Sequence, residues 1–415
     1  MSANIDERLI ETVHNKGSGI TRFAIWKSGA WSIEHEYLTK DGRRLIPYSA
    51  KNNLIENDVL LLPSSPEEYG TDLRLIRDIQ EYIHHYVGVS SRFERIASYY
   101  VLLSWVYDDF NELPYLRLRG DYGSGKTRFL LTVGALCYKP IFASGASTIS
   151  PIFHMLDKFR GTLILDESDF RFSDEKADMV KVLNNGNVKG IPVLRNELLP
   201  TKEYNPRAFQ VYGPKIVATR GYFDDKALES RFITEDMGGA PLRGDIPINL
   251  PSDYKEEALA LRNKLLLYRF RNHGKNRTLE DITDAHIEPR LLQISRPLLS
   301  LVDDAEVKQE IHALIKEYQQ DIIVDRGMEI EAKILEAIKD IMNKAPDKPL
   351  VIKDITDMFC RRYGKEQERS VTARGVGLIV RRQLHLHTRK SHGVFIIPPS
   401  EQEKLPQLYR RYGIQ

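Results

Sequence analysis

Apolar positions in the first 110 residues follow two different spacings. Alternating apolar runs, separated by Gly, Asn and Asp-Gly turns, predict short strands at residues 21–26, 29–37 and 58–62. Helical spacing follows the linker-like stretch PSSPEEYG and predicts helices over residues 73–87 and 90–107. The sequence therefore predicts a small β-rich region, residues 1–70, in front of a larger domain.

The middle of the chain alternates between continuous apolar runs and amphipathic ones, as expected of a parallel sheet with flanking helices. Strands are predicted at residues 115–118, 141–143, 162–166 and 214–219, and helices at 127–137, 150–159, 174–184, 253–271 and 288–302. Residues 227–232, ALESRF, are predicted to end a short helix. Strand-like pieces at 190–195 and 208–212 flank polar turns and predict a hairpin insertion. The fold class is α/β, over a core of residues 71–320.

The last part of the chain, residues 328–400, carries a third pattern. It predicts helices at residues 329–343, 351–363 and 370–384, followed by a hairpin at 386–388 and 394–397. Three helices and a β-wing are the order of a winged helix-turn-helix, whose third helix enters the major groove of DNA.

Between the first predicted core strand and its helix lies GDYGSGKT, the pattern of a P-loop. The expected nucleotide-binding residues are Gly120, Asp121, Tyr122, Gly123, Ser124, Gly125, Lys126 and Thr127. Backbone N–H groups and the helix N-terminus would converge on the phosphates of ATP. We expect Lys126 between the β- and γ-phosphates and the Thr127 hydroxyl on Mg²⁺.

A second motif, GTLILDESD, ends a buried strand in an acidic pair. In parallel sheets, ligands bind beyond the carboxyl ends of the strands, which is where this pair falls. We expect Asp166 to act on Mg²⁺ through water and Glu167 to deprotonate the attacking water. The two motifs together predict an ATP-hydrolysing core.

Composition narrows the class of protein. With 42% hydrophobic and 28% charged residues, the chain is an ordinary globular one, and its longest apolar runs are far short of the roughly 20 residues of a membrane span. The amino terminus does not resemble a signal peptide, and the two cysteines fall in different predicted domains. We expect a cytoplasmic protein without a membrane partner, disulfide framework or thiolate metal site.

The net charge of +2 is unevenly distributed. Residues 361–390 contain nine Lys or Arg residues against two Glu residues, as expected of a nucleic-acid contact. Val371, Leu378 and Ile379 are expected to face inward, leaving a basic face outside. The predicted DNA contacts are Arg369, Arg374, Arg381 and Arg382 on or beside the third helix, and Arg389 and Lys390 on the wing. The alternative is a winged helix used for protein docking.

Residues 115–300 resemble AAA+ ATPases, in detail the helicases of phages, plasmids and mobile elements and the minichromosome-maintenance helicases. The resemblance rests on GDYGSGKT, LILDES, PKIVAT, LESRF and IEPRLLQISRPL, in that order and followed by a winged helix. It implies a polar sensor at Thr219, where the family usually has Asn, and an arginine finger at Arg231 that reaches a neighbouring subunit's ATP. The lid's sensor arginine falls on Arg290, with Arg296 as an alternative.

The same resemblance implies a homo-oligomeric ring, commonly a hexamer, with single-stranded DNA in its pore and duplex DNA at the winged helix. Lys189, Arg195 and Lys202 on or beside the hairpin are the candidates for gripping phosphates in the pore. A charged, solvated hairpin without nucleic acid is the alternative. The implied function is an ATP-dependent DNA helicase or translocase in the replication of a phage or mobile element.

Two other functions compete with this one. The first is a AAA+ DNA remodeller without helicase activity, such as an initiator, a loader or a transposition regulator. The second is a signalling or defence ATPase whose winged helix mediates oligomerisation. The acidic pair Asp108-Asp109 is expected to be a solvated helix end, and the histidines at 385, 387 and 392 lack the other ligands of a zinc site.

Overall fold

A computed structural model describes residues 2–166, 174–198, 204–223, 225–238, 243–275, 277, 287–327, 329–345, 348–363, 372–391 and 393–414. The chain divides into two compact units, residues 1–312 and residues 313–415. Each unit is described by itself. Glu167, Lys202, Arg369, Val371 and His392 lie outside the described residues.

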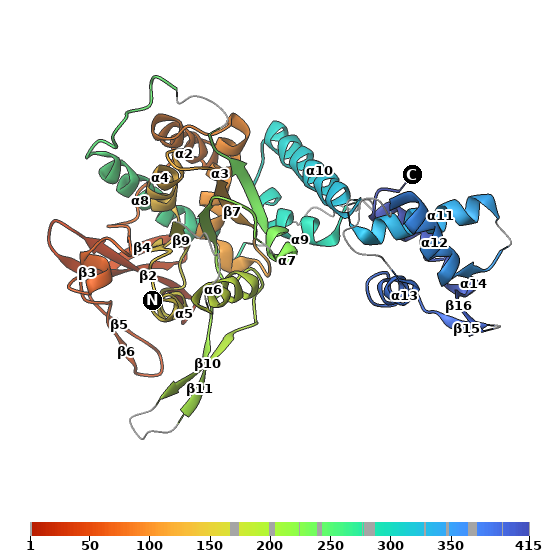
Figure 1. The fold of residues 1–415 in the computed structure, drawn as a ribbon. Helices are drawn as coiled ribbons and strands as arrows, with labels where there is room; N and C mark the ends of the chain where they lie inside the picture. The colour runs from red at the N-terminus through yellow and green to blue at the C-terminus, as the bar shows by residue number, and fades with distance from the viewer. Residues whose placement is uncertain are drawn as a thin grey trace. The chain divides into compact units, whose positions relative to one another are not determined.

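A five-stranded parallel sheet forms the centre of the first unit (Figure 1). Its strands are β7 (Tyr115–Arg119), β8 (Ile141–Ser144), β9 (Leu163–Asp166), β12 (Lys215–Thr219) and β13 (Phe232–Asp236), in the order β13-β7-β12-β9-β8. Strand β12 pairs with both β7 and β9, so it separates the two motif-bearing strands. The carboxyl ends of β7, β12 and β9 are consequently neighbours at one edge of the sheet.

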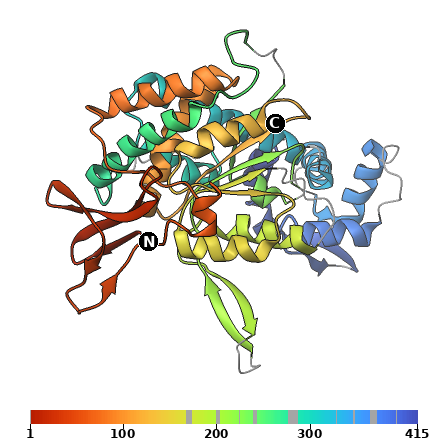
Figure 2. The ribbon, with the colours of Figure 1, turned by 90° about the vertical axis from the view of Figure 1, so that its left-hand side faces the viewer.

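Helices cover both faces of this sheet, as Figures 1 and 2 show. One face carries α2 (Asp72–Tyr86), α3 (Ser91–Trp105), α4 (Lys126–Leu136) and α8 (Tyr254–Asn272), and the other carries α5 (Ile149–Phe159) and α6 (Asp174–Asn185). The middle strands are buried on both faces: all five residues of β12, the first four of β7 and the first three of β9 are buried. The sequence predicted these elements to within a few residues.

Strand β13 and the short helix α7 (Lys226–Glu229) sit at one edge of the sheet. The sequence predicted α7 but no strand after it, because the segment FITED ends in two acidic residues. Pairing with β7 stabilises this strand although its own sequence does not favour one. Phe232 lies opposite Tyr115, and Asp236 lies opposite Arg119 and pairs with its guanidinium. Other helical elements of this unit are α1 (Asn53–Glu56), η1 (Tyr107–Asp109), α9 (Pro289–Leu299) and the start of α10 (Ala305–Gly327).

A four-stranded antiparallel sheet lies at the amino terminus, in the order β1-β2-β3-β4. Its strands are β1 (Ser2–Ile5), β2 (Arg8–Asn15), β3 (Ile20–Lys27) and β4 (Ala30–Glu34), and a small ribbon follows, β5 (Tyr37–Leu38) with β6 (Arg44–Leu45). The first two strands were not predicted. The strand predicted at residues 58–62 is wrong: Leu60 forms only an isolated bridge with Ile141, which joins this region to the edge of the main sheet.

A buried cluster of charged groups fastens this sheet to the core. Glu11, 1% exposed, pairs with Arg269 of α8 at 2.7 Å and with Lys139 at 2.8 Å. Arg269 also pairs with Asp108 at 2.7 Å. Burial alone would raise the pKa of Asp108, but the Arg269 guanidinium outweighs it and holds that pKa well below its usual range.

The acidic pair is therefore not a solvated helix end, as the sequence suggested. His273 contacts Asp108 at 3.1 Å, and Arg277 pairs with Asp109 at 2.6 Å. Asp108, Asp109 and His273 are close enough to hold a metal ion, but both carboxylates already neutralise arginines. The pair acts as a structural anchor for the end of α8.

The hairpin β10 (Val193–Leu198) and β11 (Tyr204–Phe209) projects from the face that carries α5 and α6 (Figures 1 and 2). Its strands pair in register from Val193–Phe209 to Leu198–Tyr204. At its base, Phe209 is buried against Phe153 of α5, with ring centroids 5.9 Å apart. The predicted hairpin is thus present, with its strands displaced by a few residues.

The second unit contains helices and a small three-stranded sheet. Its elements are the end of α10, α11 (Ile330–Lys344), α12 (Ile352–Tyr363), α13 (Ala373–Arg382), α14 (Pro399–Gln402), α15 (Leu405–Arg411) and the strands β14 (Leu350–Val351), β15 (Arg389–Ser391) and β16 (Val394–Ile397). The strand order is β14-β16-β15. The first wing strand was predicted at residues 386–388, but Leu386 is buried in the helical core and pairing starts at Arg389.

No helix in the described part of the chain combines the length and the apolar character needed to cross a membrane.

Candidate nucleotide site

The predicted P-loop forms a tight turn between β7 and α4. Gly123 and Gly125 adopt φ angles of +73° and +93°, a backbone region that favours glycine. A Cβ on Gly120 would lie 2.6 Å from the Met237 carbonyl oxygen, so only glycine fits there. The Gly120 N–H donates to the carbonyl of Thr219 at the end of β12. The loop is therefore held against the sheet edge at which β7, β12 and β9 end.

The second motif meets the P-loop at this edge. Thr127 Oγ1 donates a hydrogen bond of 2.8 Å to a carboxylate oxygen of Asp166 at the end of β9. The donor set is a hydroxyl and a carboxylate, oxygen ligands of the kind that Mg²⁺ binds. These two residues, predicted from motifs that lie far apart in the sequence, are brought into direct contact.

Lys126 lies inside the curve of the loop. Its ammonium donates to the carbonyl oxygens of Gly120 at 2.5 Å and Asp121 at 2.7 Å, and lies 3.4 Å from Ser124 Oγ. A phosphate entering the loop would offer charged oxygens in place of these neutral carbonyls, and charge-assisted hydrogen bonds are the stronger ones. The loop thus presents its cation to the position where an anion would bind.

Thr219 is 2% exposed and ends β12 between the two motif strands. Its hydroxyl is buried and has no hydrogen-bond partner among the described residues. A buried polar atom left without a partner is costly, and such atoms in native proteins commonly have a functional explanation. This placement is consistent with the polar sensor that the resemblance implied.

Two cavities adjoin the P-loop. The first, of about 280 Å³, is lined by the loop residues 122–127 together with Arg128, Asp166, Ala218, Thr219 and Arg220. The second, of about 580 Å³, shares Gly123, Ser124, Gly125 and Arg128 and is also lined by residues 87–90, 235–238, Arg243 and Ile248. Pockets for small ligands usually measure about 300–1,000 Å³. The pair offers room for a triphosphate at the loop and for a base and ribose beside it.

Arg128 was missed by the sequence reasoning. It directly follows the GKT motif, lines both cavities and donates to the carbonyls of Pro247, at 2.5 Å, and Ile248. It thereby ties α4 to the segment that borders the second cavity. Its place next to the motif was the available signal, but its carbonyl partners lie 119 and 120 residues away.

The arginine expected to act as a finger is buried within its own chain, which corrects that prediction. Arg231 is 6% exposed, and its guanidinium donates to Asn187 Oδ1 at 2.8 Å, to Asn184 and to the Ala227 carbonyl at 2.7 Å. Burial lowers the pKa of Arg231, and the like charge of Arg290 lowers it further. The contacts described for this side chain are thus all within its own chain.

Arg290 does not line either cavity around the P-loop. It lies at the start of α9, where its guanidinium contacts the Ala227 carbonyl at 3.4 Å beside Arg231. Arg296, the alternative, is half-buried on the same helix and is also absent from both cavity linings. The sensor role of either arginine stays a prediction.

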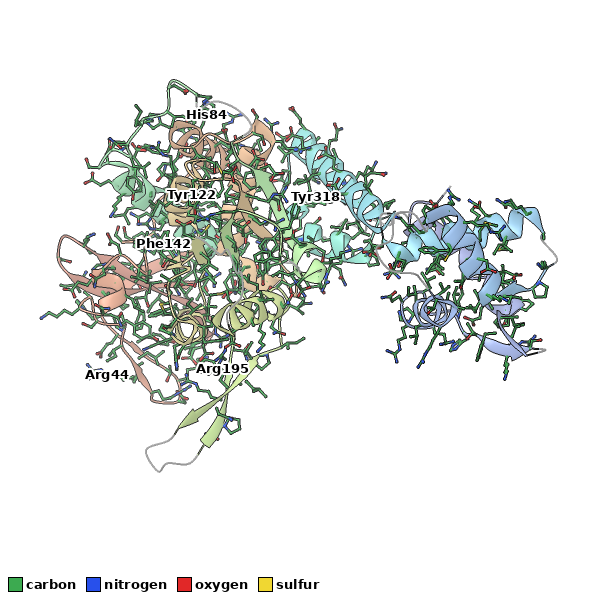
Figure 3. All side chains as sticks on the ribbon, viewed as in Figure 1. Arg44, His84, Tyr122, Phe142, Arg195 and Tyr318 are labelled. Atoms are coloured by element: carbon green, nitrogen blue, oxygen red, sulfur yellow. The ribbon has the colours of Figure 1, made fainter. Side chains whose placement is uncertain are left out.

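The two described candidates for the pore are held by contacts within the chain. Arg195 is on strand β10 of the hairpin (Figure 3). It pairs with Asp178 of α6 at 2.6 Å, and its guanidinium carbon lies 4.2 Å from the ring centroid of Phe153. Lys189 precedes strand β10 and donates to the Asp108 carbonyl at 2.9 Å, so it does not lie on the hairpin. Both serve at least as structural contacts.

In the second unit, the basic side chains predicted to meet DNA are exposed. They are Arg374, Arg381 and Arg382 on α13 and Arg389 and Lys390 on β15. The inward face of α13 differs from the prediction: Val376, Gly377 and Val380 are buried, whereas Leu378 is 38% exposed. The basic face survives this correction because 374, 381 and 382 stay on the outer side.

No family model matches the chain, and none of the curated proteins does. Among solved structures, the apo C-terminal region of NrS-1 is 9% identical, with 93% of this chain and 95% of that chain covered and a TM-score of 0.39. Cch of SCCmec type IV, described as an active helicase, is 14% identical, with coverage of 95% and 94% and a TM-score of 0.39. The JCV helicase is 15% identical, with coverage of 61% and 62% and a TM-score of 0.26. These likenesses are too weak to support a function, which is argued below from the residues alone.

Proposed function

We propose that the chain is an ATP-hydrolysing motor that moves along DNA, a helicase or translocase that works as a ring of copies in replication of a phage or mobile element. The observation that carries the nucleotide part is the 2.8 Å contact between Thr127 and Asp166 at the mouth of a cavity. It joins the two halves of an ATPase motif across three strands.

In the proposed hydrolysis, each of these groups has a role. Mg²⁺, when bound at Thr127 and Asp166, supplies positive charge to the phosphate oxygens. Lys126 binds the β- and γ-phosphates, and Glu167 takes the proton of the water that attacks the γ-phosphorus as the bond to the β–γ bridging oxygen breaks. The Thr219 hydroxyl orients the water or the γ-phosphate.

A second copy would complete the site through Arg290. Arg231 and Arg290 meet at Ala227, level with the amino ends of β13 and β7, whereas the P-loop follows the carboxyl end of β7. Five residues of strand span about 16 Å, so Arg290 is remote from its own chain's phosphates. We therefore assign the arginine that acts on a neighbour's ATP to Arg290 and a supporting role to Arg231.

DNA would be bound by two surfaces. The exposed basic residues of α13 and β15 suit the phosphates of a duplex, and this contact would weaken as salt rises because counterions are released. The hairpin β10–β11, with Lys202 between its two strands in the sequence, is the element proposed to contact a single strand in the pore. Phosphate contacts of this kind give binding without sequence preference.

The test is an ATPase assay on purified protein with and without single-stranded DNA, run beside size measurement with and without an ATP analogue. The proposal predicts hydrolysis that DNA stimulates and a ring that the analogue stabilises. Protein that neither binds nor hydrolyses ATP would overturn it.

The contacts of Lys189 and Arg195 within the chain favour a second candidate, a AAA+ ATPase that remodels DNA as a switch without unwinding it. Such a protein has no need of cations displayed along a pore. A strand-displacement assay separates the two functions, since ATPase activity and DNA binding without unwinding would select the switch.

A further inference from the structure

Arg220 follows the sensor residue Thr219 directly and lines the same 280 Å³ cavity as Lys126, Thr127 and Asp166. We propose that Arg220 binds the terminal phosphate of a nucleoside triphosphate in its own chain's cleft, and that Tyr122 holds it at the cavity rim until the triphosphate arrives. The assignment rests on the proposed nucleotide site and adds to it a residue that distinguishes triphosphate from diphosphate.

The rim contact is a stack between two residues of the cavity wall. The Arg220 guanidinium carbon lies 3.7 Å from the ring centroid of Tyr122, the third residue of the P-loop motif. The Tyr122 side chain is 74% exposed. Arg220 is also exposed, so both side chains lie where the cavity meets solvent.

Short anchored segments hold Arg220 in reach of the cavity. On one side Thr219 is the buried end of β12. On the other, the Tyr222 ring lies 3.8 Å from the guanidinium of Arg119, and the Phe223 N–H donates to Glu229, which pairs with Arg117 at 2.6 Å. The backbone on both sides of Arg220 is thus fixed, and the movement needed is a rotation of its side chain.

The balance of interactions favours that rotation when phosphate is present. Stacking of a cation on an exposed ring is weak, whereas hydrogen bonds between a guanidinium and a phosphate are charge-assisted and can be bidentate. The γ-phosphate carries the outermost charge of the triphosphate and is expected beside Thr219. A diphosphate ends one group earlier, nearer Lys126, and gives Arg220 less to bind.

The experiment compares the affinities of full-length protein for ATPγS and for ADP, both with Mg²⁺. Arg220→Ala is expected to weaken ATPγS binding by about tenfold or more and to leave ADP binding within about twofold. Arg220→Lys should recover part of the loss, because it restores the charge without the planar fork. Arg43→Ala, which removes an exposed arginine of the amino-terminal region paired with Asp41, is the matched control.

A reporter tests the movement itself. In Tyr122→Trp, ATPγS should change the tryptophan emission more than ADP does, after subtraction of the parent protein's signal, and Arg220→Ala in that background should abolish the difference. An unchanged ratio of ATPγS to ADP affinity in Arg220→Ala would overturn the assignment while leaving the nucleotide site standing. A parent protein that binds neither nucleotide would overturn the proposed function and this assignment together.

Discussion

The two ends of the parallel sheet differ in the surroundings of their polar side chains. At the carboxyl end, Thr127, Asp166 and Thr219 surround a cavity, and the Thr219 hydroxyl has no partner among the described residues. At the amino end, Lys215 and Arg231 are buried, and the hydrogen bonds described for them go to neutral oxygens. The carboxyl end is thus arranged for a ligand, whereas the buried polar groups at the amino end form hydrogen bonds within the chain.

The amino end also shows how basic side chains can be buried without carboxylates. Lys215 donates to the carbonyls of Gly186, Val211 and Gly213 at 2.9–3.1 Å, and Arg231 contacts Asn184 and Asn187. These contacts cluster at the carboxyl end of α6, where the helix dipole favours positive charge. An arginine in a motif-like segment can therefore hold the fold together and have no access to a neighbour's site.

Removing the cation of the cavity end should have the largest effect. Lys126→Ala is expected to lower the rate of ATP hydrolysis by about 10³-fold, because a preorganised charge on the phosphates is lost. The unfolding free energy should change less than the rate, since Lys126 donates to two carbonyls of its own loop. Steady-state kinetics and chemical denaturation measure the two. Lys40→Ala, at an exposed position of the amino-terminal region, is the control.

The two arginines at the amino end should respond differently. Arg231→Ala is expected to lower the unfolding free energy by about 2–3 kcal/mol, because buried charge-assisted hydrogen bonds are lost. Arg290→Ala should leave stability nearly unchanged and lower hydrolysis by about 10²-fold at protein concentrations that give the ring. Parallel denaturation and ATPase measurements decide. Equal stability of Arg231→Ala and parent would contradict the structural role.

Lys215 gives the amino end a dependence on pH. Burial lowers its pKa from 10.5 to about 7. Above pH 7 the folded protein has released this proton while the unfolded chain still holds it, so stability should rise with pH, by at most about 1.4 kcal/mol per unit. Denaturation between pH 7 and pH 9 should show the slope in the parent and a flatter one in Lys215→Met. Identical slopes in the two proteins would contradict the assignment.

The second unit differs from the amino end of the sheet because its basic side chains are exposed. The double variant Arg381→Ala/Arg382→Ala should weaken binding to duplex DNA by about tenfold at low salt and reduce the dependence of affinity on salt. Arg410→Ala removes an exposed arginine of α15 and serves as the control. Binding titrations at several salt concentrations measure both quantities. Unchanged affinity would favour the use of this unit for protein docking.

The residues that sequence could place are those fixed by local spacing. The P-loop follows from its glycines and from the strand and helix around it, and Asp166 follows from the end of an apolar run. Strand β2 was missed because Glu11 and Thr12 break its apolar pattern. That pattern makes sense only once Arg269, 258 residues away, neutralises Glu11.

Dependence on distant contacts also explains why the sequence did not predict the burial of Arg231 or the start of the first wing strand. LESRF marks a helix end in the sequence, but only the contacts with Asn184 and Asn187 decide whether Arg231 is buried. Leu386 lies in a segment with the pattern of a wing strand, yet its side chain is buried in the hydrophobic core of the second unit. Contacts between residues far apart in the sequence could not be predicted from local spacing and became known only from the structure.

The central claim is that the cavity at one end of the sheet is completed by an arginine from the other end of a second copy. Mixing Lys126→Ala with Arg290→Ala tests it most directly, because each variant keeps the half that the other lacks. The account predicts that the mixture hydrolyses ATP faster than either variant alone, at the same total protein. Mixed rings that form, by size measurement with differently tagged chains, and yet show no gain at any ratio would contradict it.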